Sequence, residues 1–158
     1  MFNQQNFSWT DDFQSLEMIP EEVLYWLIDT NSLTQKLKSK FKDFSVEIIN
    51  NKTRCATDNE STLIGESKKI LERNVTLNGC GKKLVYAQSL IPICKEFDKL
   101  LSIGSKPLGE ILFNDKKIKR CQFEIAFFEG IWARRSIFIS KHKRILVSEF
   151  FLDDLYEG

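Results

Sequence analysis

The stretch ILERNVTLNGCGKKLVYAQSLIP, residues 70–92, predicts a β-hairpin from which the rest of the sheet can be built. Its centre, NGCGKK, has the glycines of a tight turn, and a proline ends the apolar second arm. Alternate side chains of a strand share a face, and one face of the first arm is apolar except for an arginine: Leu71, Arg73, Val75 and Leu77. The opposite face is polar: Glu72, Asn74 and Thr76. The position of Arg73 predicts an anionic partner, supplied by the protein or by a ligand.

Further strands are predicted on both sides of this hairpin. FSVEIIN (44–50) alternates apolar and polar residues, and three strand-like runs follow near the C-terminus: KRCQFEIAFF (119–128), GIWARRSIFIS (130–140) and RILVSEFFL (144–152). The short connections EG and KHK between these runs favour antiparallel pairing. The total is about six strands.

Helices are predicted before the hairpin and after it. Residues 19–44 begin with a proline and acidic residues and carry apolar residues at helical spacing, which indicates two helices broken near residues 29–32. CKEFDKLLSI (94–103) and KPLGEILF (106–113) indicate two shorter helices. Residues 51–67 are polar and aperiodic, so we expect a long loop there, either a lid or a disordered segment. The expected fold is α+β: an antiparallel sheet with helices packed on one face.

The length and charge of the chain limit the kinds of partner. At 158 residues we expect a single domain over 1–158, with 1–18 as a loosely held N-terminal segment. The formal net charge is +1, from 23 basic and 22 acidic side chains, so no overall field attracts a polyanion. We therefore expect no nucleic-acid partner. The expected oligomeric state is a monomer.

Cysteine and histidine usage argues against a metal site. The four cysteines form no CxxC pair and the single histidine, His142, lies in a basic turn, so we expect reduced thiols and no zinc. The first twenty residues lack the basic residues of a targeting signal, and no apolar run is long enough to span a membrane. A soluble protein is expected. The bias toward Lys, Asn, Ile and Phe is typical of AT-rich coding DNA, as in organelle genomes.

A second charged residue also falls in register with apolar positions. In the last run Glu149 shares a face with Ile145, Val147 and Phe151, and in the run before it Arg135 shares one with Ala133, Ile137 and Ile139. Two interpretations are open. In the first, Arg73 and Glu149 pair with each other, or their strands lie at a solvent-exposed edge of the sheet. In the second, a cavity lies between the sheet and the helices, where Arg73 binds a carboxylate and Glu149 binds a hydroxyl group.

Four segments in the same order resemble the chorismate pyruvate-lyases. GIWARRSIFISKHKRILVSEFFLDDLY (130–156) resembles their C-terminal signature, and KPLGEILF resembles their Pro-Leu-Gly segment. ERNVTLNGCGKKLVYAQSLIP (72–92) is similar to their arginine-bearing hairpin, and DTNSLTQKLK (29–38) to their N-terminal helix junction. The similarity is greatest to the plastid-encoded and cyanobacterial members. It covers most of the chain from about Ile19 onward.

The resemblance implies a chorismate lyase-like fold and an enzyme that converts chorismate to 4-hydroxybenzoate and pyruvate without a cofactor, for quinone biosynthesis. It implies that Arg73 binds the ring carboxylate, that Glu149 meets the ring hydroxyl, and that the main chains of Leu33 and Leu108 contact the ligand. Gln88 stands where the family has an arginine, and Arg135 or Lys106 are candidates to replace that charge. The plastid stroma or a bacterial cytoplasm is the expected location. The alternative is a non-catalytic domain of the same fold that binds or senses a small aromatic acid.

Overall fold

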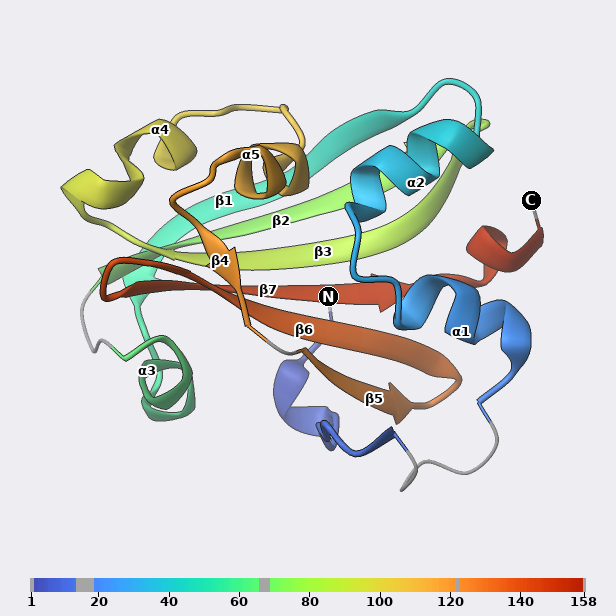
Figure 1. Cartoon of the computed structure of the whole chain (residues 1–158), viewed down its shortest axis with the longest axis horizontal. Coiled ribbons are helices and arrows are strands. Elements are labelled where there is room, and N and C mark those ends of the chain that lie inside the picture. Colours follow the sequence, from blue (N-terminus) through green and yellow to red (C-terminus); the bar gives the residue numbers. More distant parts are fainter. Residues whose placement is uncertain (1, 14–18, 66–68, 122, 158) are drawn as a thin grey trace.

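The computed structural model describes residues 2–13, 19–65, 69–121 and 123–157, which form one antiparallel sheet with helices on both sides (Figure 1). The strands are β1 (Ser45–Cys55), β2 (Lys69–Gly79), β3 (Lys82–Pro92), β4 (Lys119–Arg120), β5 (Glu124–Phe128), β6 (Ile131–Ser140) and β7 (Lys143–Phe151). Their order is β1-β2-β3-β7-β6-β4, and β5 also pairs with β6. The predicted α+β class, hairpin and antiparallel connections are confirmed.

The described residues form seven strands rather than six because the run 119–128 is interrupted. Arg120 pairs with Phe138, whereas Glu124 pairs with Arg135, so the register shifts by one residue between them. The run therefore makes two strands, β4 and β5. Residue 122, which the alternation pattern included, lies outside the described residues.

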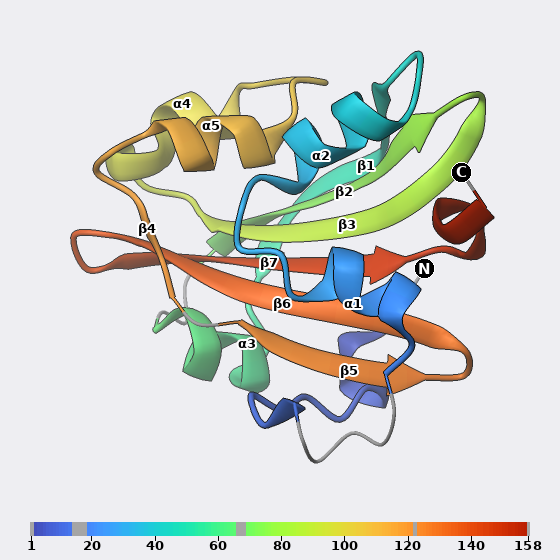
Figure 2. The same ribbon diagram turned by 45° about the vertical axis from the view of Figure 1, so that its right-hand side comes forward.

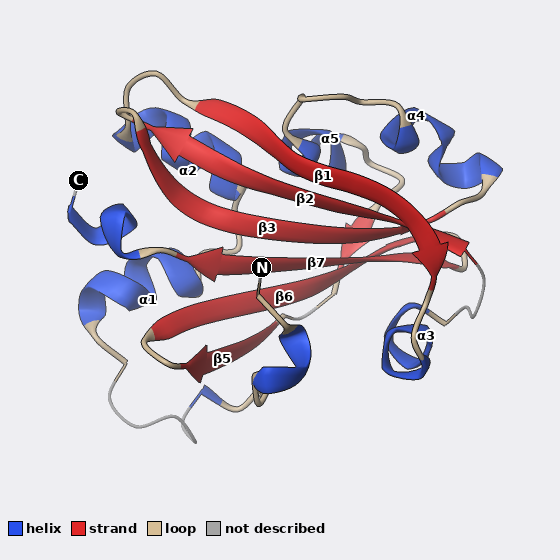
Figure 3. Ribbon diagram, turned by 180° about the vertical axis from the view of Figure 1, so that it is seen from behind, coloured by secondary structure: helices blue, strands red, loops and turns tan. Residues whose placement is uncertain are grey.

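Most helices cover one face of the sheet, as the sequence predicts. The helices are α1 (Glu21–Leu27), α2 (Leu33–Lys40), α3 (Asp58–Ile64), α4 (Asp98–Leu101) and α5 (Leu108–Asn114). Figures 1 and 2 show α1, α2, α4 and α5 over the same face, which we call the inner face. Seen from behind in Figure 3, α3 and the N-terminal segment lie against the opposite, outer face.

The core between the inner face and the helices is apolar. Val23, Trp26 and Leu27 of α1 lie at i, i+3 and i+4 and are buried in one cluster with Leu37 of α2. Leu112 of α5 is buried in a second cluster. Full burial of a side chain of this size contributes about 1.5–3 kcal/mol. No helix of the described chain is long and apolar enough to cross a membrane.

The loop predicted over residues 51–67 is wrong in its described part. β1 continues to Cys55 and α3 follows at Asp58; residues 66 and 67 lie outside the described residues. Thr57 and Glu60 form a capping box that starts α3, and Gly65 ends the helix with φ 76°. The sequence TDNE (57–60) carries this signal for the start of a helix, but the polar composition of the segment led to the prediction of a loop.

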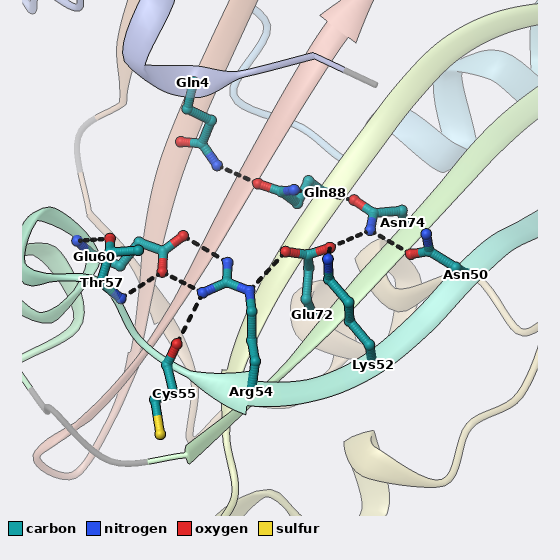
Figure 4. Close-up of polar contacts among 10 residues, drawn as sticks. All are labelled: Gln4, Asn50, Lys52, Arg54, Cys55, Thr57, Glu60, Glu72, Asn74 and Gln88. Atoms are coloured by element: carbon teal, nitrogen blue, oxygen red, sulfur yellow. Dashed lines mark hydrogen bonds and ion pairs between the residues drawn. The ribbon is translucent and has the colours of Figure 1, made fainter.

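A polar network connects α3 and the N-terminal segment to the outer face (Figure 4). Arg54 donates to Glu60 at 2.6 Å and to Glu72 at 2.8 Å. The Asn74 amide donates to Glu72 at 2.7 Å and accepts from Gln88 at 3.1 Å, and Gln88 accepts from Gln4 at 2.6 Å. Glu72 and Asn74 are buried, so the predicted polar face of β2 is a second buried layer rather than a solvent face.

Loss of the α3 cap should destabilise the protein modestly. Thr57→Ala removes the hydroxyl that accepts from the Glu60 amide at 3.3 Å, and we expect the free energy of unfolding to fall by about 1 kcal/mol in urea denaturation. Thr62→Ala, at an exposed position of the same helix, is the control and should change little. Equal effects of the two changes would mean that the cap does not start α3.

The network also predicts a dependence of stability on pH. Burial would raise the pKa of Glu72, but hydrogen bonds from Asn74 and Arg54 outweigh it, and the pKa is lowered from 4.5. The folded state therefore holds this carboxylate more strongly ionised than the unfolded state does. The resulting stability is present above about pH 4.5 and is lost as the pH falls through the folded-state pKa.

We expect Glu72→Gln to show a weaker loss of stability than the wild type between pH 5 and about pH 3 in urea denaturation. Glu47→Gln, at an exposed position of β1, should follow the wild-type profile. A Glu72→Gln profile parallel to the wild type would contradict the assignment.

Candidate active site

A small cavity lies between the inner face and the helices, at the place that the second interpretation of the sequence expects. Arg73, Glu149, Leu33 and Leu108 all line it. Val75 and Leu77 line it too, so the predicted face of β2 points into the cavity. The free volume inside is about 50 Å³.

Arg73 is a buried cation whose bonding capacity is partly unused. Its side chain extends from β2, where the residue is 3 % exposed, and one terminal nitrogen donates to the carbonyls of Gly104 at 3.3 Å and Lys106 at 2.9 Å. Its Nε has no hydrogen-bond partner among the described residues. Burial lowers the pKa of Arg73, since desolvation disfavours the charged form. A carboxylate would supply the missing acceptor and charge.

Glu149 is held by Arg134 rather than by Arg73. Arg134 Nε donates to Glu149 at 2.9 Å, and its Nη1 donates to the carbonyls of Leu27 at 3.2 Å and Asp29 at 2.8 Å. Arg134 is 1 % exposed. Through these hydrogen bonds this buried cation connects the end of α1 to the carboxylate in the cavity. Arg73 and Glu149 therefore do not form the salt bridge of the first interpretation.

Arg134 was missed by the sequence analysis, which chose Arg135. β6 pairs with β7 so that Arg134 lies opposite Glu149, and the two share the inner face. Arg135 lies on the outer face, where it donates to Glu124 at 2.9 Å and stacks over the ring of Trp9. Both faces of β6 are covered, so apolar residues occur on both and the hydrophobic pattern did not show which arginine faces inward.

Gln88 and Lys106 do not reach the cavity either. Gln88 lines an open groove of about 750 Å³ on the outer face, within the network of Figure 4. The side chain of Lys106 is exposed, and only its carbonyl contacts Arg73. An arginine at position 88 would lie on the outer face, away from Arg73. The presence of glutamine at this position, where the family has an arginine, therefore removes no charge from the cavity.

Leu33 and Leu108 are the first residues of α2 and α5, which lie side by side (Figure 2) and both contribute residues to the lining of the cavity. The first N–H groups of a helix have no acceptor within the helix, so both positions offer main-chain donors near the cavity. The Thr34 hydroxyl lies 3.2 Å from where a Cβ on Gly109 would be, so glycine allows the two helices this close approach.

A third arginine of the cavity, Arg120 of β4, was also missed. In a single continuous strand over 119–128 Arg120 would share a face with Glu124, but the register shift after β4 places the two residues on opposite faces. Three guanidinium groups, of Arg73, Arg120 and Arg134, thus line the cavity with one carboxylate, Glu149. Among the described residues, no group of three or more His, Cys, Asp or Glu side chains could hold a metal ion.

The fold and this cavity define an α+β protein with a small cavity, lined by three arginines and one glutamate, between a sheet and a pair of short helices. The family model for chorismate lyase matches residues 3–158, and the chain belongs to that family.

Curated relatives agree with this membership. A probable chorismate pyruvate-lyase of Psychromonas ingrahamii is 36 % identical over 84 % of this chain and 83 % of its own length. One of Pseudoalteromonas atlantica is 34 % identical over 80 % of this chain and 77 % of its own length. The effector domain of PhnF from Mycobacterium smegmatis shares the fold at 9 % identity, with a TM-score of 0.61 over 81 % of this chain and 92 % of that domain.

Proposed function

We propose that this protein is a chorismate pyruvate-lyase, which converts chorismate to 4-hydroxybenzoate and pyruvate. The observation that carries the proposal is the charge of the cavity, with three guanidinium groups and a single carboxylate. The surplus of two positive charges complements the two carboxylates of chorismate. Membership of the chorismate lyase family supports the same substrate.

The reaction needs orientation and electrostatic stabilisation rather than redox chemistry. The C–O bond to the enolpyruvyl group breaks, the ring loses a proton and becomes aromatic, and the departing enolpyruvate takes up a proton to become pyruvate. In the proposal Arg73 binds the ring carboxylate through two guanidinium nitrogens. Glu149 binds the ring hydroxyl and accepts proton density as the bond breaks, while Arg134 holds this carboxylate in place.

The small free volume gives this scheme a dynamic requirement. Ligand pockets usually measure roughly 300–1,000 Å³, and the cavity here holds about 50 Å³. Substrate entry therefore requires α2, α5 and the turn that Arg73 holds at Gly104 and Lys106 to move outward. Once closed, the site excludes water, which strengthens each charged contact and slows product release.

The remaining assignments belong to the same proposal. We infer that residues 1–158 form a single domain, that the protein is a monomer, and that it acts on a small molecule rather than a nucleic acid. Main-chain groups of Leu33 and Leu108 contact the ligand, and the product enters quinone biosynthesis. The relatives named above are bacterial, which favours a bacterial cytoplasm and gives no support to a plastid location.

The direct test is to incubate the purified protein with chorismate in the presence of EDTA and to separate the products by chromatography. We expect 4-hydroxybenzoate and pyruvate in equal amounts, at a rate proportional to protein concentration. Saturable 4-hydroxybenzoate binding without turnover would overturn the proposal and favour the non-catalytic binding domain of the same fold.

A further inference from the structure

Arg120 is a half-buried cation that lines the cavity and for which the protein provides no counterion at close range. Its Nε and Nη2 donate to the Ser136 hydroxyl at 3.1 and 2.8 Å, and its Nη1 donates to the Thr30 carbonyl at 3.4 Å. All three bonds go to neutral oxygens. Among the described residues, no carboxylate lies within 4.0 Å of this guanidinium group.

Aromatic rings, rather than carboxylates, are the other close neighbours of Arg120. The rings of Phe113, Phe123 and Phe138 lie 5.0–5.8 Å from the guanidinium carbon and offer cation–π attraction but no full negative charge. Burial and the nearby positive charge of Arg134 lower the pKa of Arg120 to about 10. The charges of Glu149 and Asp29 offset this lowering only in part, so binding of an anion would stabilise the charged form further.

Arg120 also approaches the ligand space from the side opposite Arg73. β2 and β4 are separated by β3, β7 and β6 in the sheet, and Figure 1 shows β4 beside α5 at the β6 side. Both arginines nevertheless line the same cavity. A ligand that neutralises both must carry an anionic group at each of two ends.

We propose that Arg120 binds the carboxylate of the enolpyruvyl group, the second carboxylate of chorismate, while Arg73 binds the first. The inference rests on the proposed function and extends it, because it assigns the group that leaves as pyruvate. Arg134 is already paired with Glu149, so Arg73 and Arg120 are the two cations that remain for a dianion. The product 4-hydroxybenzoate has only one carboxylate and leaves Arg120 without an anion.

This assignment separates substrate from product in an experiment. Arg120→Gln should lower kcat/KM for chorismate by about 10- to 100-fold, the range of one charge-assisted hydrogen bond. Its dissociation constant for 4-hydroxybenzoate, measured by calorimetry, should stay within about twofold of wild type. Arg120→Lys keeps the charge and should recover part of the loss. Arg144→Gln, at an exposed position of β7, is the control and should behave as wild type in both assays.

Two outcomes would overturn the inference. One is a wild-type kcat/KM in Arg120→Gln. The other is a parallel loss of affinity for 4-hydroxybenzoate, which would mean that Arg120 shapes the cavity as a whole.

If Arg120→Gln fails to fold, the same criteria apply to Arg120→Lys. If the wild-type protein binds chorismate without turnover, the proposed function fails, and the comparison is repeated by titration with chorismate and 4-hydroxybenzoate. Equal effects of Arg120→Gln on the two titrations would then overturn the inference separately.

Discussion

Replacement of Arg73 by alanine is expected to lower kcat/KM for chorismate by about 1,000-fold. The change removes the guanidinium that binds the ring carboxylate, and two charge-assisted hydrogen bonds of about 1.5–3 kcal/mol each account for an effect of this size. Binding of 4-hydroxybenzoate should weaken in parallel, because the product keeps that carboxylate. Initial rates and calorimetric titration measure the two quantities.

The controls for Arg73 separate binding from folding. Arg73 also holds the carbonyls of Gly104 and Lys106, so thermal unfolding of Arg73→Ala should be measured beside its activity. Arg73→Lys keeps the charge but loses the paired donors, and we expect an intermediate rate. Wild-type turnover by a folded Arg73→Ala variant would exclude Arg73 from substrate binding.

Replacement of Glu149 by glutamine is expected to reduce kcat by about 100- to 10,000-fold with little change in KM. The amide keeps an oxygen that can accept from Arg134, but it does not take up proton density as the C–O bond breaks. A fall in kcat at constant KM is the signature of an interaction that is made in the transition state. Steady-state kinetics over a range of chorismate concentrations separates the two parameters.

Glu149→Ala provides the contrast. It leaves Arg134 buried without its carboxylate, and the loss of one partner of a buried pair costs about 3–5 kcal/mol of stability. We therefore expect Glu149→Gln to unfold near the wild-type temperature and Glu149→Ala well below it. A Glu149→Gln variant with the kcat of wild type would show that this carboxylate takes no part in the chemistry.

The elements with strong local patterns were predictable from the sequence. Two-residue alternation and glycine-rich turn chemistry predicted the β2–β3 hairpin, and helical spacing with a proline start predicted α1 and α2. α3 was missed because its residues are mostly polar, although Thr57 and Glu60 carry the capping-box signal. The split of 119–128 into β4 and β5 depends on pairing with β6, which no local pattern contains.

The site was predictable where only one face of a strand is apolar. β2 has such a face, and Arg73 on this face lines the cavity. On β6 both faces are covered, so the inward orientation of Arg134 rather than Arg135 depends on the register with Glu149. The inward position of Arg120 depends on the register shift after β4. The inward orientation of two of the three arginines of the cavity thus depends on strand pairing, which cannot be read from local sequence patterns.

The central claim is that the cavity under α2 and α5 binds the ring of chorismate between Arg73 and Glu149. A crystal structure with 4-hydroxybenzoate tests it most directly. The account predicts the ligand inside this cavity, with its carboxylate on the Arg73 guanidinium and its hydroxyl within hydrogen-bond distance of Glu149. Density for the ligand in the outer groove beside Glu72 and Gln88, or in the cavity with its carboxylate directed at Glu149, would contradict it.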